Sequence, residues 1–141
     1  MQRSIRNSLI ILFCTTIGLG CGGSKNTMNK YYGKWKVINA YGKDFMAANA
    51  NIEFRGRGTL FGFGGCNTYS GSYVLNEEKR TLTFGPLMAT KKYCQGIGSD
   101  CESQLFRALN NATKYLAKTE GIYIQNDRGD NFAFIVKSKE N

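Results

Sequence analysis

The sequence contains no histidine among its 141 residues. Imidazole is the base in Ser/His/Asp and Cys/His catalytic pairs and a ligand in most catalytic zinc sites, so its absence excludes most hydrolase mechanisms. Proline occurs once and no internal repeat is present, which excludes low-complexity and solenoid chains. We therefore expect one globular domain that holds no metal and no cofactor and is not an enzyme.

Long runs of basic residues are also missing. The formal net charge is +9, and it falls to +7 when Arg3 and Arg6 of the amino-terminal segment are set aside. The other bases are scattered or paired, as at Lys91 and Lys92, and no run is long enough to mark a nucleic-acid-binding arm. We predict a solvated basic surface and no nucleic-acid partner, with contact to an anionic surface as the alternative.

Residues 1–20 have the features of an export signal. Arg3 and Arg6 give a positive start, and an apolar stretch over residues 9–19 follows. Because this stretch is much shorter than the roughly 20 residues that span a bilayer as a helix, we expect it to be removed. Residues 18–21, Gly-Leu-Gly-Cys, resemble the bacterial lipobox, with the leucine displaced by one position. We expect a lipoprotein anchored in a membrane through lipidated Cys21; ordinary secretion is the alternative.

The segment that begins at Cys21 lacks hydrophobic periodicity. Residues 21–29 are rich in glycine and small polar residues, which is typical of a flexible tether. We expect the folded domain over residues 30–139.

A lipoprotein of this kind belongs to the cell envelope and faces the periplasm, on the outer membrane if the cell is Gram-negative. We expect it to be a monomer.

Apolar and polar residues alternate with a period of two through much of the domain, which predicts β-strands. In the first predicted strand, one face carries Trp35, Val37, Asn39 and Tyr41. The predicted strands and hairpins are a strand over 35–41, a hairpin over 51–66, strands over 71–75 and 81–84, and a final hairpin over 121–137.

One strong helix is predicted at about residues 99–116. Ser99 and Glu102 have the spacing of a capping box, in which each side chain bonds the backbone N–H of the other residue. Apolar residues from Cys101 to Leu116 then recur on one stripe at helical spacing, as expected for a face that packs on a core. These elements predict a single small α+β domain, in which a curled antiparallel β-sheet is packed by one α-helix.

Four blocks of sequence, in a fixed order, resemble a known family. Residues 35–37 (Trp-Lys-Val) open the first strand, and residues 65–73 (Gly-Cys-Asn-Thr-Tyr-Ser-Gly-Ser-Tyr) follow the hairpin. Residues 82–94 form a third block that ends in Cys94. The fourth block, in the helix, contains Glu102, Leu105, Leu109 and Tyr115. In these blocks the chain resembles the META domain, the heat-shock protein HslJ-like domain of envelope lipoproteins, over about residues 33–136.

The resemblance implies a disulfide between Cys66 and Cys94, with Cys101 left as a free thiol. The residues by themselves leave two other outcomes open, a bridge between Cys94 and Cys101 or three reduced thiols. The resemblance also implies an envelope protein associated with heat or antibiotic tolerance, without an established reaction. Structural roles are expected at the remaining family-pattern positions, which are Trp35, Gly65, Asn67, Tyr69, Gly71, Thr90 and Glu102.

Three functions follow from these residues. We predict a non-enzymatic envelope lipoprotein that binds an unknown envelope protein, peptide or small ligand. The first alternative is a thiol-dependent redox protein or enzyme that uses Cys101 or Cys94, because a helix amino terminus or neighbouring lysines lower a thiol pKa. The second alternative is a small-ligand binder that uses an aromatic site at the mouth of the curled sheet. The aromatic residues expected near that mouth are Trp35, Tyr41, Phe63 and Tyr69.

Overall fold

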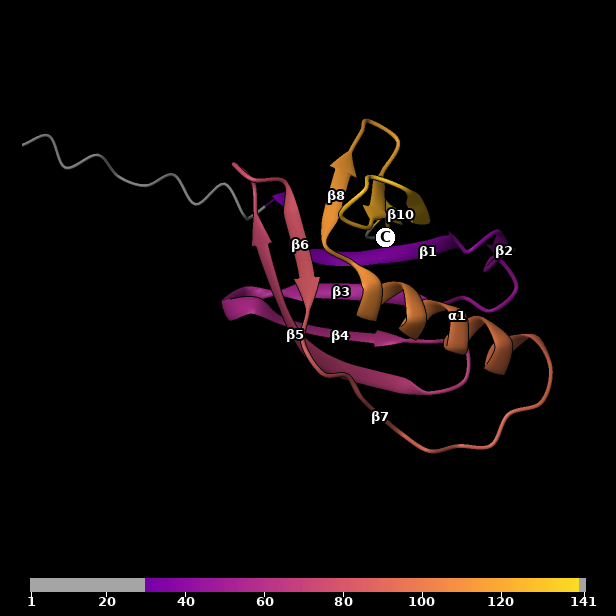
Figure 1. Ribbon diagram of the computed structural model, residues 1–141. Coiled ribbons are helices and arrows are strands. Elements are labelled where there is room, and N and C mark those ends of the chain that lie inside the picture. The colour runs from indigo at the N-terminus through magenta and orange to yellow at the C-terminus, as the bar shows by residue number, and fades with distance from the viewer. Residues whose placement is uncertain (1–29, 140–141) are drawn as a thin grey trace, which may run out of the picture.

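A computed structural model describes residues 30–139 of the chain (Figure 1). These residues form ten β-strands and one α-helix, with a short 3-10 turn at Gly56–Gly58. The predicted amino-terminal segments, 1–20 and 21–29, lie outside the described residues. The elements in chain order are β1 Gly33–Ala40, β2 Lys43–Asp44, β3 Asn51–Arg55, β4 Thr59–Phe63, β5 Thr68–Asn76, β6 Thr81–Phe84, β7 Met88–Ala89, α1 Ile97–Asn111, β8 Lys114–Ala117, β9 Ile122–Gln125 and β10 Asn131–Lys137.

Eight of the ten strands form a closed antiparallel barrel, and the two-residue strands β2 and β7 pair with β1 and β5. Around the barrel the order is β1-β3-β4-β5-β6-β8-β9-β10, and β10 then pairs with β1 again. Val37 opposite Ile135 and Ala40 opposite Ala133 are two of the residue pairs that complete this closure. The predicted α+β domain with an open, curled sheet is therefore wrong. Closure depends on pairing between the first and last long strands, and a local period of two cannot reveal such pairing.

The helix lies in the chain that connects β6 to β8, the two barrel strands with the shortest pairing. β6 and β8 share only the Thr81–Lys114 register pair, supported by backbone hydrogen bonds such as Leu82 N–H to Thr113 O at 3.1 Å. The chain between these two strands includes α1, which packs against β6, β1, β10 and β2. In Figure 1, α1 lies against the barrel between β8 and the long segment that follows β7. The helix thus packs against strands from separate parts of the barrel wall, and its buried face belongs to the barrel core.

The predicted helix of residues 99–116 is wrong at both ends. The helix begins at Ile97, its N-cap is Gly96, and no side chain caps it, so the Ser99–Glu102 capping box does not form. Beyond Asn111 the chain becomes extended, and residues 114–117 form β8 instead of a last helical turn. Pairing of β8 with β9 outweighs the helical spacing of the apolar residues there.

A β-bulge changes the predicted inner face of β1. Its pairing with β10 shifts register between Val37 and Asn39. Trp35 and Val37 share the buried face, but Ala40 takes the next inward position in place of Asn39. The bulge therefore leaves Tyr41 outside the barrel core, in the turn that connects β1 to β2.

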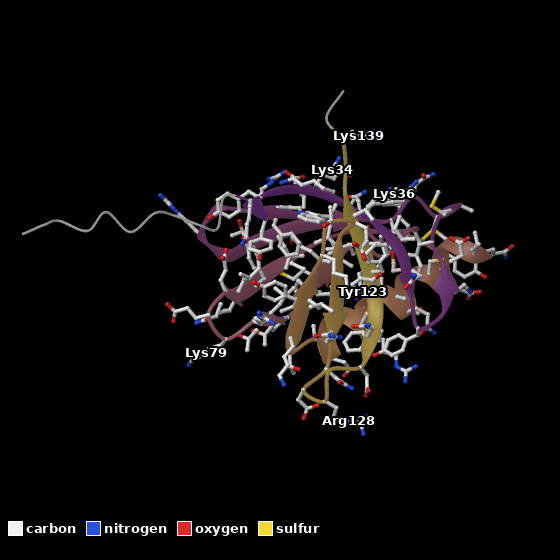
Figure 2. The ribbon with its side chains drawn as sticks, turned by 90° about the horizontal axis from the view of Figure 1, so that it is seen from above. Lys34, Lys36, Lys79, Tyr123, Arg128 and Lys139 are labelled. Atoms are coloured by element: carbon white, nitrogen blue, oxygen red, sulfur yellow. A yellow bond between two sulfur atoms is a disulfide. The ribbon has the colours of Figure 1, made fainter. Side chains whose placement is uncertain are left out.

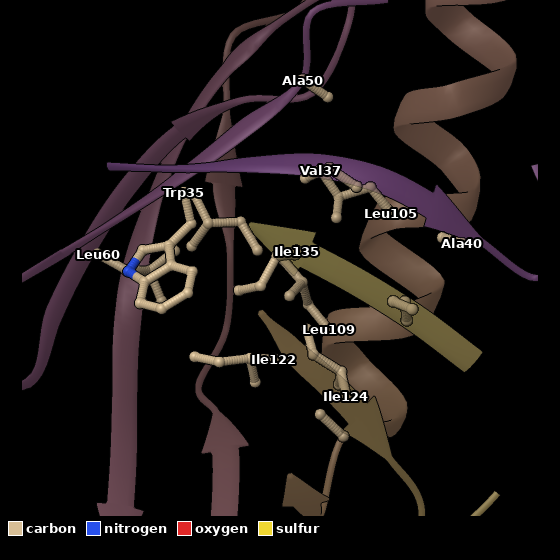
Figure 3. Close-up of a cluster of buried hydrophobic side chains, with 14 of the residues drawn as sticks. Trp35, Val37, Ala40, Ala50, Leu60, Leu105, Leu109, Ile122, Ile124 and Ile135 are labelled. Carbon is tan, nitrogen blue, oxygen red and sulfur yellow. The ribbon is translucent and has the colours of Figure 1, made fainter. Parts of the chain in front are cut away.

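Apolar side chains from the strands and from α1 fill the barrel (Figure 3). Leu105 and Leu109 of α1 are fully buried and belong to the same cluster as Val37 and Ile135. Each such side chain contributes about 1.5–3 kcal/mol when it is fully buried. The buried Trp35 indole N–H donates to the Tyr31 backbone oxygen at 2.8 Å, which satisfies its polar atom. The barrel interior is thus a packed core.

Among residues 30–139, no helix is both long and apolar enough to cross a membrane.

Candidate functional site

The glycine-rich connection between β4 and β5 passes directly over the first turn of α1. Gly65 has a φ of 114°, and a Cβ atom at this position would lie 2.9 Å from the Gly98 backbone oxygen. A Cβ at Gly98 would in turn lie 2.5 Å from the Gly65 oxygen. Only glycine on both sides allows two backbones to approach this closely. This contact brings the family-pattern residues 65–67 against the helix.

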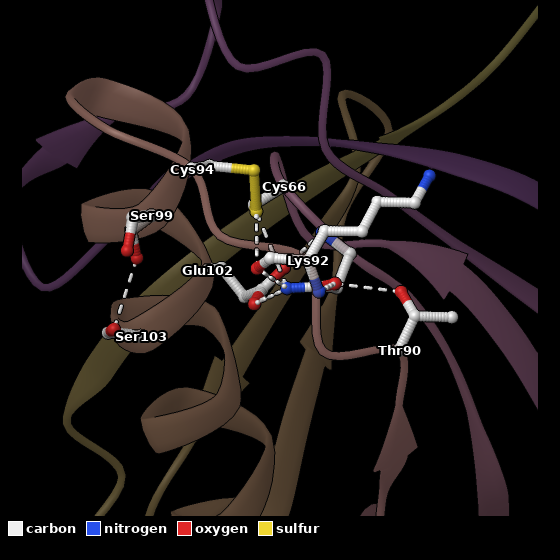
Figure 4. Close-up of a disulfide and its surroundings, with 8 residues drawn as sticks. Cys66, Thr90, Lys92, Cys94, Ser99, Glu102 and Ser103 are labelled. Carbon is white, nitrogen blue, oxygen red and sulfur yellow. Dashed lines mark hydrogen bonds between the residues drawn. A yellow bond between two sulfur atoms is a disulfide. The ribbon is translucent and has the colours of Figure 1, made fainter.

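Asn67 is buried and forms hydrogen bonds with Glu102, Thr90 and Lys92, three residues that Figure 4 shows close together. Its backbone N–H donates to Glu102 Oε2 at 2.5 Å, and its side-chain Nδ2 donates to Glu102 Oε1 at 2.8 Å. Its Oδ1 accepts from Thr90 Oγ1 and from the Lys92 backbone N–H, each at 2.7 Å. One side chain therefore joins the β4–β5 connection, the segment after β7, and α1.

The disulfide of this region joins Cys66 to Cys94, with 5.9 Å between the two Cα atoms (Figure 4). This is the pairing that the family resemblance implies, so a Cys94–Cys101 bridge and a fully reduced set of thiols are both wrong. Cys101 is a free, fully buried thiol whose Sγ lies 3.6 Å from the Asp44 backbone oxygen. Burial raises the pKa of the Cys101 thiol, which disfavours the reactive thiolate.

The remaining family-pattern residues also serve the fold. The Tyr69 hydroxyl donates to the Asn51 backbone oxygen at 2.9 Å, its ring lies over Gly62, and burial raises the pKa of its hydroxyl. A Cβ atom at Gly71 would lie 2.8 Å from the Leu87 side chain. We name residues Gly65, Cys66, Asn67, Thr90, Lys92, Cys94 and Glu102 the signature cluster. The side chains of Asn67, Thr90 and Glu102 bond one another, and Lys92 takes part through its backbone, so the cluster is a structural joint.

The predicted aromatic mouth does not form. Trp35 and Tyr69 are buried in the core, where their rings are covered. Tyr41 lies elsewhere, stacked on Phe132 with 5.3 Å between ring centroids and an interplanar angle of 6°. Phe63 is half-buried at the end of β4 and does not line the hollow that contains Tyr41. The four aromatic residues that the sequence suggested as one ligand site therefore do not form one.

A surface hollow of about 570 Å³ does contain charged side chains, Arg107 and Asp127, that form no ion pair among the described residues. We name it the charged groove; Tyr41, Arg107, Asn111, Phe132 and the turn of residues 126–130 line it. The Arg107 guanidinium lies 4.4 Å from the centre of the Tyr41 ring, and Asn111 Nδ2 donates to the Tyr41 hydroxyl at 3.1 Å. Sequence reasoning missed this site, although Arg107 and Asn111 stand four residues apart on the polar side of the helix.

The fold and the signature cluster together define a class of protein, a small antiparallel barrel domain with one helix. A buried asparagine joins that helix to the barrel wall, and a disulfide joins the β4–β5 connection to the segment that precedes the helix. The META domain family matches residues 27–139 of this sequence. The chain belongs to that family.

Solved structures share the fold at low sequence identity. A crystal structure of a DUF4847 family protein from Bacteroides vulgatus is 19% identical, with a TM-score of 0.58, over 77% of this chain and 94% of that chain. An NMR structure of a protein from Burkholderia xenovorans is 22% identical, with a TM-score of 0.61, over 80% of this chain and 88% of that chain. No curated protein matches the chain. At these identities the likeness establishes the fold alone.

Proposed function

We propose that this META domain protein is a non-enzymatic lipoprotein of the cell envelope, attached to a membrane through lipidated Cys21 and facing the periplasm. It acts as a monomer by binding an envelope component, in a setting of heat or antibiotic stress. Cys21 lies outside the described residues, so the anchor rests on the sequence of residues 1–21.

The observation that carries the proposal is that Lys30, the first described residue, lies at the end of the barrel opposite the charged groove. Lys30 lies near the start of β1, where its Nζ pairs with Glu77 at 3.0 Å, and Tyr41 of the groove follows the last residue of β1. An eight-residue strand extends over about 26 Å. Figure 1 shows β1 running between these two sides of the molecule. A lipid anchor at Cys21 would therefore be attached to the chain ahead of the side of the barrel that lies away from the groove.

The thiol groups support binding over thiol chemistry. Cys94 is held in the disulfide, and Cys101 is fully buried with a raised pKa. A redox or nucleophilic cysteine needs both access to its substrate and a stabilised thiolate. Neither residue meets both conditions, so the thiol-dependent alternative is not part of the proposal.

The distribution of basic residues supports a partner other than nucleic acid. In Figure 2, Lys34 and Lys36 lie near Lys139 on one side of the molecule, whereas Lys79 and Arg128 lie at other edges. Recognition of a phosphate backbone uses bases gathered along one face. A dispersed arrangement instead suits a solvated surface.

Metabolic labelling with a fatty acid tests the anchor. Wild-type protein is expected to incorporate the label and to fractionate with membranes, and Cys21→Ala is expected to lose both properties. Cys14→Ala is the matched control, because it removes the other cysteine of the amino-terminal segment and should leave labelling intact. An unlabelled wild-type protein, or a labelled Cys21→Ala variant, would overturn the proposed lipid attachment.

A further inference from the structure

We infer that the charged groove binds a small zwitterionic ligand, a molecule that carries both a free carboxylate and a free ammonium group, as a short peptide does. The carboxylate binds at Arg107 and Asn111, and the ammonium group binds at Asp127. This inference deepens the proposed binding function by naming its site and ligand class. Binding itself does not require the lipid anchor.

The groove holds its arginine in place before any ligand arrives. Phe132 stacks on Tyr41, and the Arg107 guanidinium lies over the Tyr41 ring at 4.4 Å. Tyr41 itself has a φ of 48°, a left-handed conformation that costs free energy for a residue other than glycine. The β1–β2 turn thus places an aromatic ring where it supports the guanidinium. Such a fixed side chain loses less conformational entropy when a ligand binds.

Arg107 is a donor group without an acidic partner among residues 30–139. The four ion pairs of the described residues all involve other bases, and within this part of the chain the Arg107 guanidinium forms no hydrogen bond. A guanidinium presents a planar fork of N–H donors that matches the two oxygens of a carboxylate. Asn111 stands beside it on α1 and adds an amide group to the same wall. This wall is therefore suited to a carboxylate.

The β9–β10 turn, which also lines the groove, supplies the negative charge. Arg128 and Asp130 neutralise each other, with 3.3 Å between Nε and Oδ2, and Asn126 Nδ2 also donates to Asp130. The Asp127 carboxylate forms no ion pair within the described part of the chain. Lys114 is the nearby base, and its Nζ donates to the Asp127 backbone oxygen at 2.7 Å. One positive and one negative side chain without an ion-pair partner among the described residues thus line the same groove, one from α1 and one from the β9–β10 turn.

The dimensions and position of the groove suit a small ligand. Its volume of about 570 Å³ lies in the usual range of small-molecule sites. Arg128 projects from the tip of the β9–β10 turn at the rim of the molecule (Figure 2), so the turn forms an open wall and not a buried one. A net charge of zero favours a zwitterion over a plain anion or a plain cation. The charged residues that line the groove have this net charge; they are Arg107, Arg128, Asp127 and Asp130.

A peptide and its two blocked forms test the inference. The full chain, purified in detergent, is titrated with alanylalanine, with N-acetyl-alanylalanine, which lacks the ammonium group, and with alanylalanine amide, which lacks the carboxylate. Backbone amide shifts in NMR spectra give the dissociation constants. We expect the unblocked dipeptide to bind at least about tenfold more tightly than either blocked form. The shifts should centre on residues of the groove.

Substitutions test which residue binds the carboxylate of the dipeptide and which binds its ammonium group. Arg107→Ala should weaken dipeptide binding at least tenfold, and Arg107→Lys should restore part of the loss because it keeps the charge but not the fork. Asp127→Asn should abolish the preference for the dipeptide over its N-acetyl form. Lys79→Ala is the matched control, since Lys79 lies in the β5–β6 turn, distant from the groove. Thermal unfolding of each variant separates loss of binding from loss of fold.

Three results would overturn the inference. These are equal binding of all three peptides, unchanged binding by folded Arg107→Ala protein, and no binding of alanylalanine at millimolar concentration. None of them depends on lipid attachment, so a failure here leaves the membrane anchor standing. Conversely, an unlabelled wild-type protein would remove the anchor and leave the dipeptide titration unaffected.

Discussion

The signature cluster and the charged groove contain the same kinds of side chain, but the cluster uses them to hold the fold and the groove leaves them available to a ligand. Asn67 is 5% exposed and uses its amide and backbone N–H in bonds to three other residues. Asn111 lies in the open groove, where its amide contacts the Tyr41 hydroxyl. The residues of the two sites therefore differ in their roles. Residues that identify the family hold the fold, while the groups that remain available to a ligand lie outside the family pattern.

The same contrast holds for charged groups. Glu102 has both carboxylate oxygens occupied by Asn67, so it is committed to the joint between α1 and the barrel wall. Arg107, little more than one helical turn further along the same helix, is held over a ring and keeps its donors free. One helix therefore joins the wall at its first turns and lines the groove with its later ones.

Removal of the disulfide should produce the largest loss of stability. The double variant Cys66→Ser/Cys94→Ser opens a link between residues 28 positions apart, and the chain-entropy relation gives about 3.5 kcal/mol for its contribution to the free energy of unfolding. Denaturant unfolding of wild type and variant measures the difference. Wild-type protein under reducing conditions should show the same loss. A change below about 1 kcal/mol would show that the remaining cluster holds the segment after β7 without the covalent link.

Asn67→Ala should have the next largest effect. It removes the amide that bonds Glu102, Thr90 and Lys92, and it leaves a carboxylate oxygen and a backbone N–H of the joint without these partners. We expect the free energy of unfolding to fall by about 2–3 kcal/mol. Asn111→Ala is the matched control in the groove and should cost less than about 0.5 kcal/mol. Equal losses for the two variants would contradict the division between joint and groove.

The sequence predicts the local parts of this fold. The hairpin over residues 51–66 corresponds to β3 and β4, because apolar residues alternate on both sides of a Gly-Arg-Gly turn. The core face of the helix, with Leu105 and Leu109, follows from helical spacing. In both cases the information lies within about fifteen neighbouring residues, and the core then supplies the free energy that stabilises the element.

Features that depend on residues far apart in the sequence cannot be predicted from local patterns. Closure of the barrel needs β10 to pair with β1, and the residues that become β8 fit a helical stripe until β9 is present to pair with them. The capping box fails because Asn67, more than thirty residues away, takes the Glu102 carboxylate. The charged groove combines the β1–β2 turn, α1 and the β9–β10 turn, none of which carries a ligand motif of its own. The disulfide was accessible through family resemblance, not through the spacing of its cysteines.

A pair of tyrosines provides the smallest test of the comparison. Tyr73, the last residue of the 65–73 family block, is buried, and its hydroxyl donates to the Arg55 backbone oxygen at 2.9 Å. Tyr73→Phe should lower the free energy of unfolding by about 1 kcal/mol at neutral pH, because the Arg55 oxygen loses its donor. Tyr41→Phe, in the groove, loses an exposed hydroxyl that accepts from Asn111, and should change stability by less than about 0.5 kcal/mol.

The pH dependence sharpens the difference. Burial raises the pKa of Tyr73 to about 12, above the value of about 10 for an unfolded chain. The unfolded state then releases its proton first as the pH rises, so the stability that Tyr73 contributes is present below pH 10 and is lost between about pH 10 and 12. Tyr73→Phe should therefore lose less stability than wild type across this window in urea unfolding. Other buried tyrosines, such as Tyr69, titrate in both proteins, so the informative quantity is the difference between the two curves. Parallel curves for wild type and Tyr73→Phe would mean that the hydroxyl of this family position is as accessible to water as one in the groove.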